Sequence, residues 1–378
     1  MVFFLFACSP DFESRPFPAG DSVLDSVDTA RAGLDSGWAD DSGWRDDSAA
    51  AWDSATTEPA EPDCPEGVVC VDWLPYRETF TTRGAVSDWD AYGCAPGTDE
   101  SGPEVVYQVT VAEEGFLALD LRHVESGADV DVHLLGSLDP DDCFDRGHWT
   151  AGAWVPAGQY YVVADTWVDS GGNAKPGEYT LQMGHLSALD MAVEGLDRGT
   201  ASLALQALDR AWDEGWSDEP TLGVLDFSLR SDLERLWIWD LAGEELLHQL
   251  HATHGEGSSS SSDAGLAVRF SNTEGSHQSS LGMTIGAEDY VGSNGLSLRL
   301  DGLEAGYNDA VRERAIVVHG ADYARPEYVD SYGRLGQSWG CPAVDDRISD
   351  LVVADLQDAY LWSYYPDGDW SVNSTYLP

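Results

Sequence analysis

The sequence predicts a mainly β protein in which a disordered segment precedes a β-sandwich and a β-rich α+β domain. Three observations support this prediction. Residues 9–63 contain no sustained apolar pattern, the middle of the chain has short alternating runs separated by Gly, Pro and Asp, and the last half adds helical spacing to such runs. The chain has 378 residues, 43% of them hydrophobic, which is enough for more than one domain.

The N-terminal residues Met1–Cys8 form an apolar run that ends in a small residue followed by cysteine. This order is typical of the end of a lipoprotein signal, in which the cysteine is lipidated after cleavage. We expect residues 1–8 to be the remnant of such a signal, with a lipid anchor at Cys8; an ordinary apolar N-terminus is the alternative. Residues 9–63 repeat Asp-Ser-Gly-Trp units, and we expect a disordered acidic linker because this segment buries too little apolar surface to order itself.

The chain is strongly acidic, with 68 Asp and Glu against 19 Lys and Arg and a formal net charge of −49. Nucleic acids and anionic membrane surfaces bind clustered cations, so the composition excludes them as partners. The acidic excess favours a solvated surface rather than a site. We expect no cofactor and no metal ion.

Five of the six cysteines lie beyond the N-terminal run. Cys64, Cys70, Cys94 and Cys143 fall in one region, and Cys341 stands far beyond them. Four clustered cysteines and one isolated cysteine are typical of two disulfides and a separate reactive thiol in an oxidising compartment. We prefer the pairs Cys64–Cys70 and Cys94–Cys143, although the sequence leaves the connectivity open. A metal site is the alternative, but a C-x-x-C pair is absent.

Residues 64–184 are predicted to form the β-sandwich. The alternating runs are Val105–Val111, Phe116–Leu121, Asp129–Leu135, Gly158–Asp165 and Gly177–Met183. The stretches Val155–Asp165 and Gly177–Met183 resemble the bacterial pre-peptidase C-terminal domain, which implies a binding or stabilising module. Asp129, Asp131 and Asp165 are candidate calcium ligands, but no complete calcium loop is present, so we expect solvent-facing acids.

Residues 186–215 have apolar residues at helical spacing, and Gly195 and Gly199 are expected to split them into two helices. The Gly- and Ser-rich segment Gly255–Ser262 is expected to be a flexible loop. Strands are predicted over Thr221–Phe227, Leu236–Asp240, Leu266–Phe270, Leu296–Leu300, Ala315–His319 and Ala359–Ser363.

A cysteine in a Gly-rich turn and a histidine at the end of an apolar strand carry the chemistry of this sequence. Cys341 lies in the turn Gly333–Val344, and His319 ends the apolar run that begins at Ala315. A thiolate is a nucleophile, and an adjacent imidazole lowers its pKa and transfers the proton. The pair therefore predicts nucleophilic catalysis by Cys341 with His319 as the base.

Residues 186–378 resemble the murein L,D-transpeptidase catalytic domain, a YkuD-type fold. The resemblance is carried by His319-Gly320-Ala321, by Ser338-x-Gly340-Cys341, and by weaker phrases such as Leu225–Ser228 and Arg235–Leu241. It implies a peptidoglycan L,D-transpeptidase in which Cys341 forms a thioester with a tetrapeptide stem and an acceptor amine resolves it into a 3–3 cross-link. Backbone N–H groups of Gly340 and Cys341 would hold the oxyanion, and Ser338 would orient His319 or shape the turn.

The group that contacts the donor carboxylate differs from the family pattern. Many members have Arg or Asn two residues after the cysteine, where this chain has Ala343. Arg334 is the first substitute candidate and Arg314 the second, because a guanidinium binds a carboxylate in a bidentate manner. An ordinary salt bridge is the alternative for both. The other expected substrate-binding residues are Tyr323, Trp339 and Gly320.

The implied partners are peptidoglycan stem peptides, and the implied location is the cell envelope, with the protein lipid-anchored or secreted. Two other functions stay open. One is an L,D-carboxypeptidase or cysteine peptidase acting on the same bond. The other is a cell-envelope binding protein without catalysis.

Overall fold

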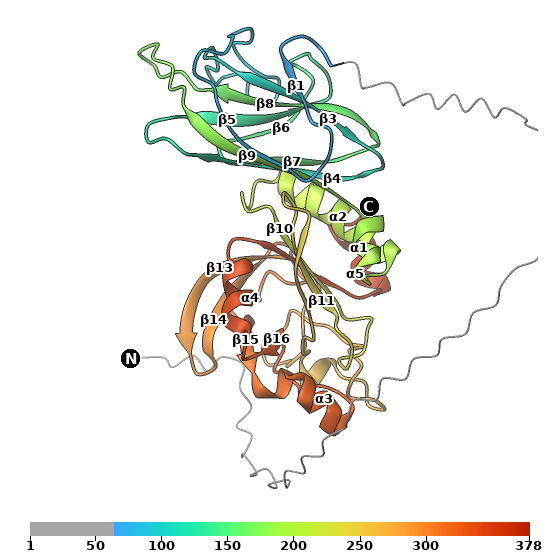
Figure 1. The fold of residues 1–378 in the computed structure, drawn as a ribbon. Coiled ribbons are helices and arrows are strands. Elements are labelled where there is room, and N and C mark those ends of the chain that lie inside the picture. The colour runs from blue at the N-terminus through green and yellow to red at the C-terminus, as the bar shows by residue number, and fades with distance from the viewer. Residues whose placement is uncertain (1–63) are drawn as a thin grey trace, which may run out of the picture. The chain divides into compact units, whose positions relative to one another are not determined.

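The computed structural model describes residues 64–378. The predicted signal remnant, the linker and Cys8 lie outside the described residues. Figure 1 shows strands β1–β9 in blue to green and a second sheet whose strands run from olive to red. Strands dominate the described part of the chain, so the predicted mainly β class is confirmed. Within residues 64–378, no helix combines the length and the apolar composition that crossing a membrane requires.

The first folded region is the predicted β-sandwich. One sheet has the order β1-β3-β8-β5-β6 and the other the order β2-β9-β4-β7. Side chains from both sheets share one buried cluster that includes Tyr107, Leu119, Val132 and Val162, as alternating strands with one apolar face require. The strands are β1 (Val68–Cys70), β2 (Tyr76–Thr81), β3 (Val105–Val111), β4 (Gly115–His123), β5 (Val130–Leu135), β6 (Cys143–Gly147), β7 (Thr150–Val155), β8 (Gly158–Thr166) and β9 (Glu178–Ser187).

The sandwich confirms the preferred cysteine pairing, with disulfides Cys64–Cys70 and Cys94–Cys143. The expectation of solvent-facing acids is wrong for two residues. Asp131 is 1% exposed and Asp165 is 0% exposed. Both carboxylates are buried because they have partners: Arg146 pairs with Asp131, and the Tyr92 hydroxyl donates to Asp165.

The second region is built on an eight-stranded sheet with the order β12-β11-β10-β17-β13-β14-β15-β16. The predicted strand Leu266–Phe270 is wrong, because only Ala267 makes an isolated bridge, to Ser259. The apolar residues there serve packing instead, and the ring of Phe270 lies 5.5 Å from that of Phe227. The strands are β10 (Thr221–Asp226), β11 (Leu236–Asp240), β12 (Glu245–Leu250), β13 (Gly282–Gly292), β14 (Gly295–Gly302), β15 (Val317–Ala321), β16 (Ala343–Asp345) and β17 (Tyr360–Tyr364).

The two predicted helices are confirmed, but Gly199 does not separate them. Gly195 has a φ of +93° and lies between the helices. Asp197 caps α2 by accepting a hydrogen bond from the Thr200 N–H at 3.0 Å, so Gly199 falls in the first turn of α2. The helices are α1 (Ala188–Val193), α2 (Arg198–Asp213), α3 (Pro326–Tyr332), α4 (Ser349–Asp355) and α5 (Gly368–Asn373), with 3₁₀ turns η1 (Glu256–Ser258) and η2 (Asp322–Ala324).

Helix α2 buries an apolar face that includes Leu205, Leu208 and Trp212. The Trp212 indole N–H donates to the Asp145 carboxylate at 2.9 Å, and the Trp154 N–H donates to Asp209 at 2.6 Å. Residues of the second sheet, including those of β15, share the same buried cluster. The strand that carries His319 therefore belongs to a packed core.

Candidate active site

His319 lies on β15, and Cys341 lies in the turn directly before the neighbouring strand β16. The two strands pair in parallel with His319 opposite Ala343, so Cys341 precedes the partner of His319 by two residues. The Val317 N–H donates to the Cys341 Sγ at 3.2 Å, and the Ala315 carbonyl oxygen lies 3.7 Å from the same sulfur. A backbone N–H that points at sulfur stabilises the thiolate form.

The sequence predicted that His319 ends a strand. In the structure it lies in the middle of β15. The reason is Ala315, whose φ of +54° is incompatible with a strand and moves the start of β15 to Val317. The register of β15 against its two neighbours therefore fixes the backbone of His319 from both sides.

The hydrogen bonding of His319 assigns its tautomer. Its Nδ1 lies 2.9 Å from the carbonyl oxygen of Gly320, which only accepts, so Nδ1 carries the hydrogen. The lone pair is then on Nε2, which is buried and has no hydrogen-bond partner among the described residues. Burial lowers the pKa of His319 and favours the neutral imidazole, the form that accepts a proton. Gly320 itself is buried, with Ser349 Oγ 2.5 Å from where its Cβ would lie.

Ser338 shapes the turn that presents Cys341. Its hydroxyl donates to the Cys341 carbonyl at 2.7 Å and accepts the Gly340 N–H at 3.2 Å. Gly340 has a φ of +120°, and a Cβ there would lie 2.7 Å from the Gln278 carbonyl oxygen, so only glycine fits. The Gly340 N–H, which was predicted to hold the oxyanion, donates to the Ser338 hydroxyl here, and its oxyanion role stays a prediction.

Thr253 supplies a second buried hydroxyl that bonds to the same turn, and no sequence motif predicted it. Its Oγ1 donates to the Cys341 carbonyl at 3.2 Å and accepts the Ala343 N–H at 3.0 Å. Ser279 likewise donates to the Gly340 carbonyl at 3.1 Å. No sequence signal connects Thr253 to Cys341, because they come from distant parts of the chain.

The segment predicted as a flexible loop, Gly255–Ser262, packs against this turn. Gly255 bridges to Ser338, the Glu256 N–H donates to the Ser338 carbonyl at 2.8 Å, and Ser258 is 0% exposed. The serines that suggested flexibility supply hydroxyl groups to buried backbone atoms; Ser258, for example, accepts the Ser279 N–H at 2.9 Å. This segment is a support for the turn.

The domain that contains Cys341 and His319 is similar to a known catalytic domain. Residues 192–365 match the family described as the L,D-transpeptidase catalytic domain. Residues 192–365 are therefore similar to an L,D-transpeptidase catalytic domain. The matched range contains β10–β17, His319 and the turn with Cys341. This confirms the resemblance seen in the motifs and implies a transferase family that cross-links peptidoglycan.

Three solved structures are similar to about a third of the chain. The pre-peptidase C-terminal domain of a collagenase from Bacillus anthracis has 17% identity and a TM-score of 0.23, and covers 32% of this chain and 99% of its own. PliG, a periplasmic inhibitor of g-type lysozyme, gives 12% identity, a TM-score of 0.20 and coverages of 31% and 95% for the Aeromonas hydrophila protein. The Salmonella Typhimurium PliG has 13% identity and a TM-score of 0.17, and it covers 32% of this chain and 98% of its own. No curated protein matches the chain.

Two disulfides and the match to a cell-wall enzyme family are consistent with an extracytoplasmic location of this protein. The predicted lipid anchor at Cys8 lies outside the described residues.

Beside the turn of the L,D-transpeptidase domain, His254 is a structural residue. The Arg235 guanidinium donates to its Nδ1 at 2.8 Å, and its Nε2 lies 3.1 Å from the Ser259 hydroxyl. Burial and the charge of Arg235 lower the pKa of His254 to about 3, so the ring is neutral. Arg235 is itself fully buried, and its donors satisfy the carbonyls of Leu229 and Ala252.

Both aromatic residues that were predicted to bind substrate lie in the turn or contact its residues. Trp339 stacks on His277 with ring centroids 4.6 Å apart and an interplanar angle of 9°, and His277 pairs with Glu256 at 2.7 Å. Tyr323 packs against Gly336, and its hydroxyl is buried with no hydrogen-bond partner among the described residues. Tyr323 therefore offers a polar atom that has no intramolecular use.

The two candidate arginines lack the ordinary salt bridge that was their alternative role. Within residues 64–378, neither Arg334 nor Arg314 forms an ion pair with a carboxylate. Arg334 donates to the Leu335 carbonyl at 2.7 Å, and Arg314 donates to the Ser280 hydroxyl at 2.6 Å and the Gln278 carbonyl at 2.5 Å. Both cations are thus held near the turn without being neutralised.

Proposed function

We propose that the protein is an L,D-transpeptidase that cross-links peptidoglycan through a thioester at Cys341. The observation that carries the proposal is the Nε2 atom of His319. It is the basic nitrogen of a neutral, buried imidazole, it lacks a partner among the described residues, and it belongs to the strand beside the cysteine turn. A buried acceptor without a partner is costly in a folded protein, so its retention supports a role in proton transfer.

The reaction begins from the reduced thiol of Cys341. His319 Nε2 takes the thiol proton, and the thiolate attacks the carbonyl carbon between the third residue of a tetrapeptide stem and its terminal D-Ala. The C–N bond breaks, Nε2 returns the proton to the departing D-Ala amine, and a thioester remains. An amine of a second stem then attacks the thioester. Its proton passes to Nε2 and on to sulfur as the C–S bond breaks.

The charge around the turn supports an anionic donor. The chain has 68 acidic residues, yet Arg314 and Arg334 have no carboxylate partner in the described part. An unpaired guanidinium near the reacting sulfur attracts the free carboxylate of the terminal D-Ala and binds it in a bidentate manner. Arg314 is the stronger candidate, because it directly precedes Ala315, whose carbonyl lies 3.7 Å from the Cys341 sulfur. The donor carboxylate would replace hydrogen bonds that its terminal nitrogens now donate, such as those to Ser280 and Gln278.

Purified tetrapeptide muropeptides test the proposal. The reduced protein is incubated with them, and the products are identified by mass spectrometry. We expect cross-linked dimers with loss of D-Ala, no product with Cys341→Ala, and a reduction of about 100-fold or more with His319→Gln, the scale of general-base catalysis. His251→Gln, which changes a histidine bonded to the Asp232 carbonyl, is the matched control.

Two results would contradict the transferase. Tripeptides without dimers would identify an L,D-carboxypeptidase, and tight binding without any product would identify a cell-envelope binding protein. Retained activity of Cys341→Ala would exclude the thioester mechanism. The lipid anchor at Cys8 is a separate proposal, and mass spectrometry of the mature N-terminus checks it.

A further inference from the structure

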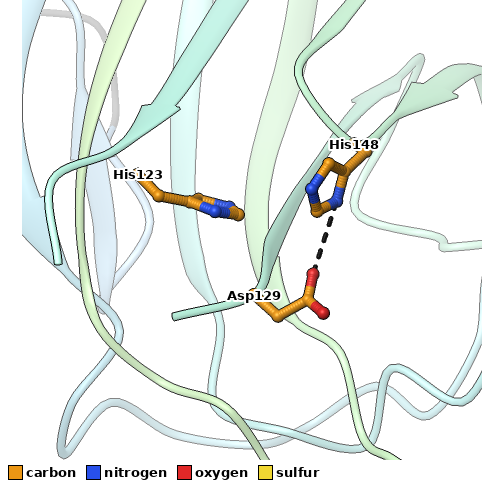
Figure 2. A group of neighbouring side chains, drawn as sticks. All are labelled: His123, Asp129 and His148. Atoms are coloured by element: carbon orange, nitrogen blue, oxygen red, sulfur yellow. Dashed lines mark ion pairs between the residues drawn. The ribbon is translucent and has the colours of Figure 1, made fainter. Parts of the chain in front are cut away.

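Three segments of the β-sandwich bring two histidines and an aspartate together (Figure 2). His123 ends β4, Asp129 directly precedes β5, and His148 lies in the turn between β6 and β7. One ligand atom of each residue lies within 4.8 Å of those of the other two. The three residues lie outside the range 192–365 that matches the L,D-transpeptidase domain, and the proposed reaction does not use them.

The oxygen and nitrogen atoms of this cluster have spacings suited to one shared ion. His148 Nδ1 lies 3.3 Å from Asp129 Oδ1 and 2.9 Å from Asp131 Oδ1. Ligands placed about 2.0–2.1 Å from a tetrahedral zinc ion are about 3.4 Å from one another. The two carboxylates and the imidazole therefore need only small shifts to enclose a cation.

The imidazoles are held in place by their surroundings. The Trp149 ring centroid lies 4.6 Å from that of His123 and 4.3 Å from that of His148. His123 Nε2 is within 3.0 Å of both the backbone N and O of Val130. A hydrogen bond from one ring nitrogen to a backbone carbonyl orients a histidine for binding a metal through the other.

Asp129 is positioned by its backbone. Its N–H donates to the Lys175 carbonyl at 2.9 Å, and its carbonyl accepts the Trp167 N–H at 3.1 Å. Asp129 has no Lys or Arg partner among residues 64–378, and its side chain pairs with His148 instead. The Asp129 carboxylate is therefore not neutralised by a permanent cation among these residues. Asp131 differs, because its Oδ2 pairs with Arg146 while its Oδ1 faces His148.

We propose that His123, Asp129 and His148 bind a divalent transition-metal ion of the zinc class, with Asp131 as a fourth ligand. Two imidazoles and carboxylates favour zinc over calcium and magnesium, which prefer oxygen ligands alone. The side chains of His148 and Asp129 are 44% and 31% exposed, which gives the ion a path from solvent. The bound ion links the end of β4, the start of β5 and the β6–β7 turn.

Isothermal titration of the full chain with zinc chloride tests the site. The protein carries Cys341→Ala, so that the active-site sulfur is not a ligand, and is first freed of metal with a chelator. We expect one zinc ion per chain. Loss of a supporting residue alone changes metal affinity by about 10–100-fold, so His148→Ala and the near-isosteric Asp129→Asn are expected to weaken binding by about 100-fold or more.

The matched control is His248→Ala, because His248 also pairs with a carboxylate, that of Asp355 at 2.7 Å, but belongs to no group of three potential metal ligands within residues 64–378. Zinc is expected to raise the melting temperature of the parent and of this control, and not that of the two site variants, since an ion that binds only the native state stabilises it. Circular dichroism checks that each variant is folded. Absence of zinc binding, equal binding by the site variants, or equal affinity for calcium would overturn the proposal.

Discussion

The cysteine turn depends on two hydroxyl groups that share one carbonyl, and this arrangement predicts non-additive mutations. Ser338 and Thr253 both donate to the Cys341 carbonyl, at 2.7 and 3.2 Å. Ser338→Ala also removes the acceptor of the Gly340 N–H, and Thr253→Val removes that of the Ala343 N–H. A buried donor left without a partner costs about 1–3 kcal/mol, so each single variant is expected to lose about that much free energy of unfolding.

The double variant removes both side-chain donors from the Cys341 carbonyl at once. Each single variant keeps one hydroxyl that donates to this carbonyl. Only the double variant leaves the buried carbonyl without a side-chain hydrogen bond. We expect a coupling of about 1–3 kcal/mol beyond the sum of the single effects. Urea unfolding of the four proteins measures it. Strictly additive losses would refute the shared-acceptor reasoning, and Thr79→Val, at an exposed hydroxyl pair with Thr180, is the control.

Three further predictions concern pH and charge. Burial lowers the pKa of His319, so the acid limb of kcat/KM is expected below pH 6.5, the ordinary histidine value. Burial raises the pKa of Glu104 to about 7 and that of Asp165 to about 9 in the native state. The native state therefore holds protons that the unfolded state has released, and the free energy of unfolding is expected to fall from pH 6.5 to pH 9. Arg314→Lys keeps the charge but loses the bidentate fork, so KM for tetrapeptide stems is expected to rise about tenfold with a smaller change in kcat.

Each of these predictions has its own check. A pH–rate profile whose acid limb lies above pH 6.5 would contradict the first. The stability series starts at pH 6.5 because buried His133, whose pKa burial lowers to about 3, opposes the trend only below that pH. Glu104→Gln is expected to flatten the series, and an unchanged slope would refute the assignment. Arg312→Lys, a surface arginine paired with Glu288, is the control for the kinetic variant.

The sequence was sufficient for the parts of the fold that depend on local pattern. Alternation predicted β3 at its observed bounds, Val105–Val111, and β11 at Leu236–Asp240. Alternation of apolar and polar residues predicts which face of a strand is buried. Apolar residues at helical spacing likewise predict the buried face of α2. The prediction was wrong at Leu266–Phe270, where apolar residues pack without pairing, and at Gly199, where the Asp197 cap outweighs the local cost of glycine.

The sequence by itself determined the motifs around Cys341 and His319 and the family that they resemble. It favoured one pairing of the sandwich cysteines without fixing it, and the structure confirmed that pairing. Only the tertiary structure decided what surrounds that chemistry. The hydroxyl of Thr253 at the turn, the lack of a carboxylate partner for Arg314 within residues 64–378, and the meeting of His123 with His148 depend on contacts between residues far apart in the chain. No local spacing encodes such contacts, because they follow from how strands pair and sheets pack.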